Sequence, residues 1–211
     1  MQSEVAHMND LNKALGEISS IRRQVARSTE FRGYGPATLA LTGVLAVVAA
    51  AAQGWRVPDP AHHLRGYLAI WVSTALVAST LAGVEVLRRT KRVHSGISDE
   101  MIRMAVEQFL PSAAAGLLIT IVVLRAVPAT AWIVPGLWQV IFSLGIFASC
   151  RFLPRPMLAA GIWYLLTGLI VIGFGDARAF SPWSMGIPFS VGQMLVAGIL
   201  LWSGKKAEHA S

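Results

Sequence analysis

The chain has 211 residues, of which 55% are hydrophobic and 14% charged, and its formal net charge is +7. A soluble domain carries about 25% charged residues, so this composition excludes an ordinary soluble domain and is typical of a protein embedded in lipid. The basic residues cluster at the ends of apolar segments, as they do when they orient a membrane protein, and we therefore expect no nucleic-acid partner.

Residues 1–32 form a polar segment in which apolar residues recur at helical spacing. These residues are Met8, Leu11, Leu15, Ile18, Ile21 and Val25. The spacing predicts a cytoplasmic amphipathic helix followed by a linker, and an apolar stripe of this kind needs a cover. The bilayer surface, a second copy of the chain and another protein are the three possible covers. Acidic residues (Glu4, Asp10 and Glu17) and the lack of Trp or Phe before Phe31 favour a protein partner or homo-oligomer over the lipid surface.

Six apolar segments follow within residues 33–204, before a short cytoplasmic tail over residues 205–211. We expect them to span the lipid bilayer at about residues 36–54, 66–87, 108–126, 131–150, 156–174 and 184–203. The clearest segment, Ala131–Cys150, has 20 uncharged residues. At about 1.5 Å per residue it matches a hydrocarbon core of roughly 30 Å. The predicted fold is therefore an all-α, polytopic six-helix membrane bundle.

Six spans place both termini on one side of the membrane, and the charges indicate which side. Of the 18 Lys and Arg residues, 14 lie on the side of the termini and four on the other. Positive charge is enriched on the cytoplasmic side, so the sequence predicts an N-in, C-in topology. Abundant Arg and Ala indicate a high-GC bacterial source, and hence the bacterial inner membrane.

A few polar residues lie inside the predicted spans and are candidates for function. Gln139 and Gln193 are the deepest, and a glutamine in hydrocarbon needs a partner on another helix. The alternative interpretation is that both line a polar pocket with Tyr164, Thr167 and Ser190.

Two acids, Glu85 and Glu107, lie near the cytoplasmic ends of their spans. Glu85 precedes Arg88 and Arg89 by three and four residues, and Glu107 follows Arg103 by four, so helix ion pairs account for both acids. The alternative is a proton-linked pair, because acids within the membrane are functional candidates by default.

The chain lacks the sequence motifs of common catalytic and nucleotide-binding sites, and no histidine lies within a predicted span. We therefore expect no metal and no cofactor. The leading interpretation is a non-enzymatic inner-membrane protein that anchors or senses, and that engages a protein partner or itself through the N-terminal helix. A small-solute or proton-linked transporter or channel is the alternative, and an intramembrane enzyme comes third.

Overall fold

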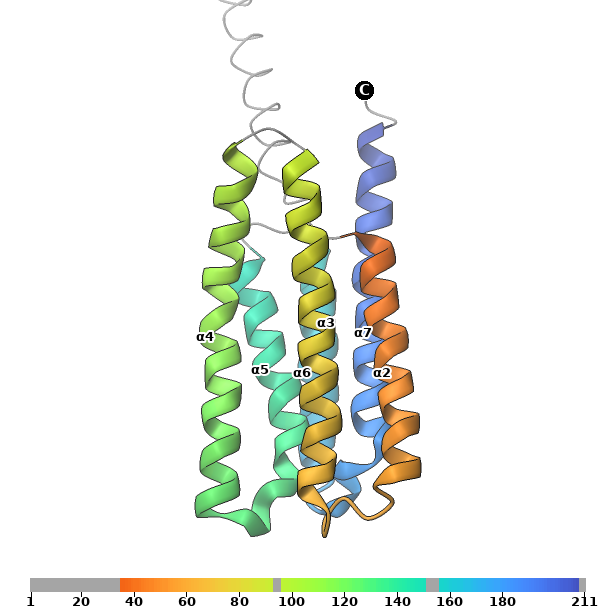
Figure 1. Ribbon diagram of the computed structural model, residues 1–211, viewed down its shortest axis with the longest axis vertical. Coiled ribbons are helices and arrows are strands. Elements are labelled where there is room, and N and C mark those ends of the chain that lie inside the picture. The colour runs from red at the N-terminus through yellow and green to blue at the C-terminus, as the bar shows by residue number, and fades with distance from the viewer. Residues whose placement is uncertain (1–34, 93–95, 151–155, 209–211) are drawn as a thin grey trace, which may run out of the picture.

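The computed structural model describes residues 35–92, 96–150 and 156–208, and every structural statement below concerns those residues. They form a helical bundle without a β-strand, which confirms the predicted all-α class (Figure 1). The helices are α2 (Pro36–Arg56), α3 (Leu64–Arg92), α4 (Gly96–Ala126), η1 (Pro128–Ile133), α5 (Val134–Ser149), α6 (Met157–Gly173), η2 (Ala177–Phe180) and α7 (Pro182–Glu208). The predicted amphipathic helix of residues 1–32 lies outside the described residues.

The helices coincide with the apolar segments of the sequence, and their composition makes this a multi-pass membrane protein. Four helical stretches within the described residues are long and apolar enough to cross a membrane. They are Pro36–Arg56, Leu64–Arg88, Pro128–Ser149 and Pro182–Trp202. Two further apolar helices, Leu110–Ala126 and Met157–Gly173, are shorter. Seventeen residues of α6 cover about 25 Å, less than the roughly 30 Å of hydrocarbon, so the six-span topology stays a prediction.

The connection between α4 and α5 is the 3₁₀-helix η1. Thr130 bonds back to the Val127 carbonyl through its backbone N–H (2.9 Å) and its hydroxyl (2.8 Å), and these bonds hold the start of η1. Helix α5 follows η1 directly, at Val134.

Successive long helices run in opposite directions, so the bundle has two ends (Figure 1). One end holds the 57–63 hairpin together with η1 and η2, and we call it the η end. The start of α2 and the last turns of α7 lie at the opposite end. Helices α2 and α7 pack closely, as do α5 and α6, and the contact of α6 with α7 joins these two pairs. Helix α3 flanks α2, and α4 flanks α5.

Glycines allow α5 and α6 to approach each other at backbone distance. A Cβ added at Gly168 would lie 2.8 Å from the Gly136 carbonyl oxygen, and one at Gly136 would lie 2.7 Å from the Gly168 carbonyl oxygen. Backbone atoms cannot rotate out of the way, so the contact requires glycine on both helices. Small residues serve this purpose in membranes, where close van der Waals packing holds helices together.

We predict that Gly168→Ala destabilises the bundle by about 1–3 kcal/mol, because the new methyl group forces α5 and α6 apart. Thermal unfolding of the detergent-solubilised chain measures the effect. Gly198→Ala is the matched control, since a Cβ at Gly198 on α7 meets nothing within 4 Å. Alanine in a helix interior is favoured over glycine by about 0.5–1 kcal/mol, so this control gains stability or stays unchanged. A Gly168→Ala variant as stable as the control would contradict the close contact.

Candidate functional site

The deepest glutamine, Gln139 on α5, forms a hydrogen bond with α7. Its side chain is fully buried, and its Nε2 donates to the Ser184 carbonyl oxygen at 2.9 Å. The same nitrogen lies 3.3 Å from the Pro135 carbonyl oxygen of its own helix and 3.8 Å from the Met185 sulfur. Gln139 thus has the inter-helix partner that its depth in the span leads us to expect.

Pro188 explains why the Ser184 carbonyl needs a donor from another helix. In a regular helix this carbonyl accepts a hydrogen bond from the N–H of the residue four positions later, which here is Pro188. Proline has no N–H, so it leaves that carbonyl unpaired, and a membrane has no water to satisfy it. The Gln139 amide supplies the missing donor.

A second buried glutamine, Gln53 on α2, joins three elements at the η end. Its Nε2 donates to the Phe180 carbonyl oxygen of η2 at 2.7 Å. Its Oε1 accepts the indole N–H of Trp71, on α3, at 2.7 Å. The Gln53 side chain is completely buried. The sequence does not reveal the role of Gln53, because this residue lies only two positions before Trp55, where a polar side chain can reach the membrane interface. Its spacing of 18 residues from Trp71 carries no recognisable signal.

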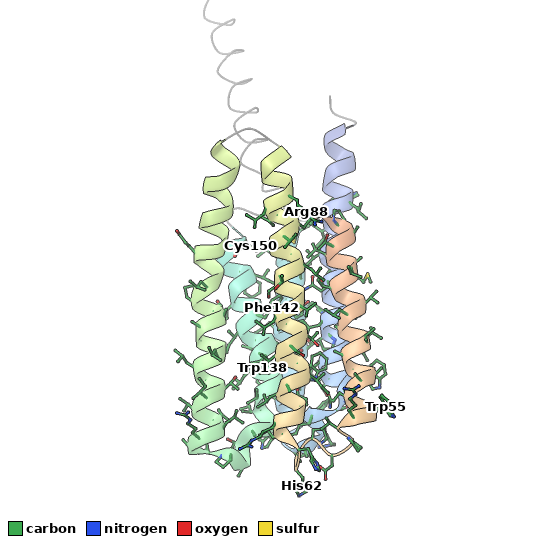
Figure 2. All side chains as sticks on the ribbon, viewed as in Figure 1. Trp55, His62, Arg88, Trp138, Phe142 and Cys150 are labelled. Carbon is green, nitrogen blue, oxygen red and sulfur yellow. The ribbon has the colours of Figure 1, made fainter. Side chains whose placement is uncertain are left out.

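Tryptophan indoles form further bonds between neighbouring helices. Trp138 on α5 donates to the Thr120 hydroxyl of α4 at 2.8 Å. Trp163 on α6 donates to the Pro188 carbonyl oxygen of α7 at 2.9 Å. Figure 2 shows Trp138 nearer to the η end of the bundle than Phe142. Together with Gln53 and Gln139, these indoles join each of the described α-helices to at least one neighbouring element through a buried or partly buried polar contact.

Substitution of Gln139 by Leu should destabilise the bundle by about 1–2 kcal/mol, because the Ser184 carbonyl loses its donor. Pro188→Ala restores the backbone N–H that would bond this carbonyl within α7. We therefore expect Gln139→Leu to cost much less in the Pro188→Ala background than in the native one. The unfolding free energies of the four proteins in this double-mutant cycle give the coupling directly. Equal costs in the two backgrounds would show that Gln139 does not stabilise α7 through Ser184.

The other residues of the predicted polar pocket do not share one hydrogen-bond network. Thr167 bonds to the Trp163 carbonyl of its own helix at 2.9 Å. The Tyr164 ring is packed edge to face against Phe142, with ring centroids 4.8 Å apart, and lies 5.2 Å from Phe189. The half-buried Gln193 interacts with the Tyr164 hydroxyl without forming a regular hydrogen bond. The region is a mainly aromatic contact between α5, α6 and α7.

Three polar atoms in the described core are buried and lack a hydrogen-bond partner there. They are the hydroxyls of Tyr67 and Tyr164 and the Oε1 of Gln139. A buried polar atom without a partner costs about 1–3 kcal/mol, so each marks a point where the packing opposes stability.

The two acids of the spans differ in their surroundings. Glu85 is half-buried and Glu107 is exposed, and both take part in interactions with other residues. The side chains of Arg89 and Arg103, two of the predicted ion-pair partners, lie outside the described part of the chain. The pairing of both acids therefore stays a prediction. The same applies to the apolar stripe Met8–Val25.

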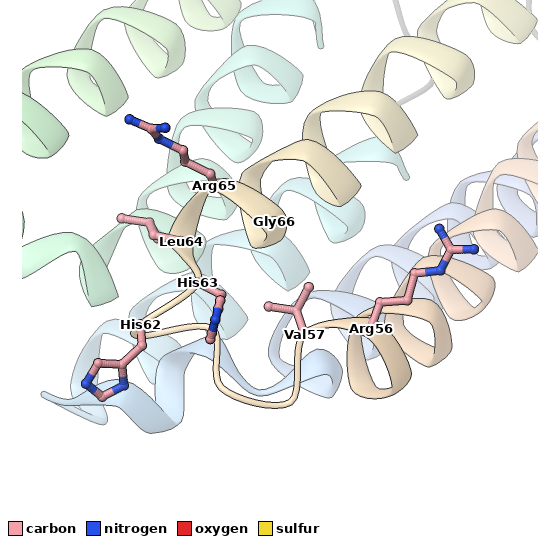
Figure 3. Close-up of a pocket in the computed structure, with 7 residues that line it drawn as sticks. All are labelled: Arg56, Val57, His62, His63, Leu64, Arg65 and Gly66. Carbon is pink, nitrogen blue, oxygen red and sulfur yellow. The ribbon is translucent and has the colours of Figure 1, made fainter.

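A pocket of about 430 Å³, largely open to the outside, lies at the hairpin between α2 and α3, at the η end (Figure 3). It is lined by Arg56, Val57, His62, His63, Leu64, Arg65 and Gly66. A Cβ at Gly66 would lie 3.1 Å from the Val57 side chain, so glycine permits the close approach that shapes the pocket wall. The lining residues include two arginines and two histidines, and none of them is acidic.

Asp59 organises both histidines of this hairpin. Its Oδ2 lies 2.7 Å from Nδ1 of His62, and its backbone carbonyl oxygen lies 3.2 Å from Nδ1 of His63. The hydrogen bond from His62 lowers the pKa of the Asp59 carboxyl, which therefore stays ionised. Carboxylate and carbonyl oxygens only accept, so both rings carry a proton on Nδ1. Among the described residues, no three His, Cys, Asp or Glu side chains lie together as a metal site requires.

The chain matches no protein-family model, no curated protein and no solved structure.

Proposed function

We propose that the chain is a non-enzymatic, multi-pass protein of a bacterial inner membrane that anchors or senses. The observation that supports this proposal is that the deep polar side chains form hydrogen bonds between elements of the bundle. The amides of Gln53 and Gln139 and the indoles of Trp71, Trp138 and Trp163 all bond to neighbouring elements. Groups used in this way stabilise the bundle, which favours function at the ends of the bundle and on the N-terminal segment.

The partner-binding element of this proposal is the helix that the sequence predicts over Met8–Val25. Its apolar stripe has coiled-coil-like spacing, since Leu11, Ile18 and Val25 are seven residues apart. A helix this short is marginal in water by itself, so it needs a surface to pack against. We propose that this surface belongs to a protein partner or to a second copy of the chain.

The N-in, C-in orientation belongs to the same proposal and rests on the distribution of charge. The start of α2, the end of α7 and Arg88 lie at one end of the bundle, opposite the η end (Figure 2). Of the 18 basic residues, 14 belong to segments at that end in the six-span topology. This bias supports a cytoplasmic position for that end.

Replacing Leu11, Leu15 and Ile18 together by Ser should abolish association through the N-terminal helix, while membrane insertion stays intact because the spans are untouched. The measurements are self-association of the purified chain in nanodiscs and co-purification of a partner identified with the native chain. A control variant changes Asn9, Asn12 and Gln24 to Ser on the polar face of the same helix. If the apolar variant retains every protein contact and the free Met8–Val25 peptide binds anionic liposomes, the helix is a membrane-surface helix instead.

A small-solute or proton-linked transporter is the second candidate. The observation that favours it is the presence of two buried polar atoms without a regular hydrogen bond, the Oε1 of Gln139 and the hydroxyl of Tyr164, since polar groups inside a membrane protein mark substrate and ion pathways. The half-buried Glu85 would then be the candidate acid for proton transfer.

Proteoliposomes decide between the two candidates. Under the anchoring proposal, proton uptake stays at the level of protein-free liposomes, and Glu85→Gln and Glu107→Gln leave it unchanged. Tyr164→Phe removes a buried hydroxyl that has no regular hydrogen bond, so we expect unchanged or increased thermal stability. Uptake that depends on the native chain and disappears in Glu85→Gln, Glu107→Gln or Tyr164→Phe would establish the transporter.

A further inference from the structure

We propose that α3 is a hinged helix. Its first turns are fixed to the bundle at the η end, and the rest of the helix swings within the bilayer about a hinge at residues 73–80. This movement follows from the way α3 packs within the bundle, so it does not depend on the partner proposed for the N-terminal helix.

The first turns of α3 are held by the core at the η end. Tyr67 is completely buried, and its ring packs edge to face against Phe180 with ring centroids 5.0 Å apart. One turn further along, Trp71 is also buried, and its indole N–H donates to Gln53 Oε1 at 2.7 Å. Gln53 is itself bonded to the Phe180 carbonyl oxygen. These contacts fix the helix up to Trp71.

Beyond Trp71 the helix has little contact with the bundle. None of residues 72–85, all of which the structure describes, is buried, and Val86 is the next buried residue. Only 11% of the apolar part of α3 is buried, against 33–39% in the other three long apolar stretches. A segment with few buried contacts moves at low cost. The contact of Val86 adds little resistance, because lipid tails are as apolar as the side chains that it would leave.

Hydroxyl groups place the hinge directly after the fixed turns. Ser73 and Thr74 both donate to the Ile70 carbonyl oxygen, at 3.0 and 2.7 Å, and Thr80 donates to the Leu76 carbonyl oxygen at 2.8 Å. These three hydroxyls therefore bond within α3 rather than to a neighbouring helix. A Ser or Thr side chain that bonds to a carbonyl one turn earlier weakens a helix slightly and often bends it.

Gly83 loosens the part of α3 beyond the hinge. A Cβ added at Gly83 would meet nothing within 4 Å, so packing within the described bundle does not require glycine there. By contrast, Gly136 and Gly168 are required by the backbone contact between α5 and α6. Glycine in a helix interior is less favourable than alanine, so Gly83 lowers the stiffness of α3 without improving its packing.

The expected displacement is large enough to measure. Leu87 is 60% exposed and precedes Arg88, which Figure 2 shows at the end of the bundle opposite the η end. Leu87 lies about 20 Å along α3 from the start of the hinge at Ser73, so a bend of about 20° would displace it by about 7 Å. This displacement opens the α3 side of the bundle towards lipid at that end.

Distances between paired spin labels, measured by pulsed electron paramagnetic resonance, test the hinge. The measurements use the full chain with Cys150→Ser, at one chain per nanodisc. The arm pair, Leu87→Cys with Leu201→Cys, joins the exposed ends of α3 and α7. We expect a broad or two-component distribution with a spread of about 7 Å for this pair.

Two control pairs separate a hinge in α3 from general disorder of the bundle. Leu41→Cys with Leu201→Cys joins exposed sites of α2 and α7 at the same end as the arm pair. Ala69→Cys with Ile187→Cys joins exposed sites of α3 and α7 near the η end. Both control pairs should give single, narrow distributions. An arm pair as narrow as the controls, or a control pair as broad as the arm pair, would overturn the proposal.

Variants of the hydroxyls locate the hinge. Ser73→Ala/Thr74→Val/Thr80→Val removes the three bonds to α3 carbonyls and should narrow the distribution of the arm pair. Thr80→Val alone should narrow it in part, which covers the case in which the triple variant does not fold. Thr167→Val is the matched control, because Thr167 forms the same kind of bond within α6. An arm distribution that Thr80→Val and the triple variant leave unchanged, or that Thr167→Val narrows equally, would contradict a hinge at residues 73–80.

Discussion

The bundle depends on one constraint: a backbone carbonyl inside hydrocarbon must be paired with a donor from the protein itself. Pro188 interrupts the hydrogen bonding of α7 and exposes the Ser184 carbonyl, and Gln139 of α5 closes the gap at 2.9 Å. The same turn of α7 accepts a second bond from Trp163 of α6, at the Pro188 carbonyl. A proline that would weaken a helix in isolation thus becomes the point where three helices are joined.

Different parts of the bundle are stabilised in different ways, some by close packing and others by hydrogen bonds between helices. Backbone contact at Gly136 and Gly168 brings α5 and α6 together without any hydrogen bond between their side chains at that point. Helix α3 has few buried residues and is attached through Tyr67 and Trp71, at its η end. Most of its remaining length is exposed, with Leu76 64% accessible and Leu87 60% accessible, and such a surface is suited to lipid.

The helices were predictable from the sequence because lipid imposes a simple rule of length and apolarity on each of them. The inter-helix role of Gln139 was also predictable, since depth alone requires a partner, but Ser184 as that partner was not. The sequence does contain the relevant feature, which is the proline four residues after Ser184: it lacks the N–H that would bond the Ser184 carbonyl. The role of Gln53 had no such signal, because its bonds to Trp71 and Phe180 depend on tertiary contacts between segments far apart in sequence. The depth of Gln193 and Thr167 in their spans predicts a shared polar pocket as one alternative, yet the side chain of Thr167 bonds to its own helix.

If the buried polar groups hold the bundle together, the residues that engage ligands or partners belong to its ends.

The hydrogen bond between Gln139 and Ser184 is the contact on which this description of the bundle depends most. Solid-state NMR of the chain in bilayers, with ¹⁵N-labelled glutamine side chains and ¹³C-labelled serine carbonyls, measures it directly. We expect a glutamine–serine cross peak that disappears in Gln139→Leu and persists in Gln193→Leu. A spectrum without this cross peak, or one unaffected by Gln139→Leu, would contradict the account.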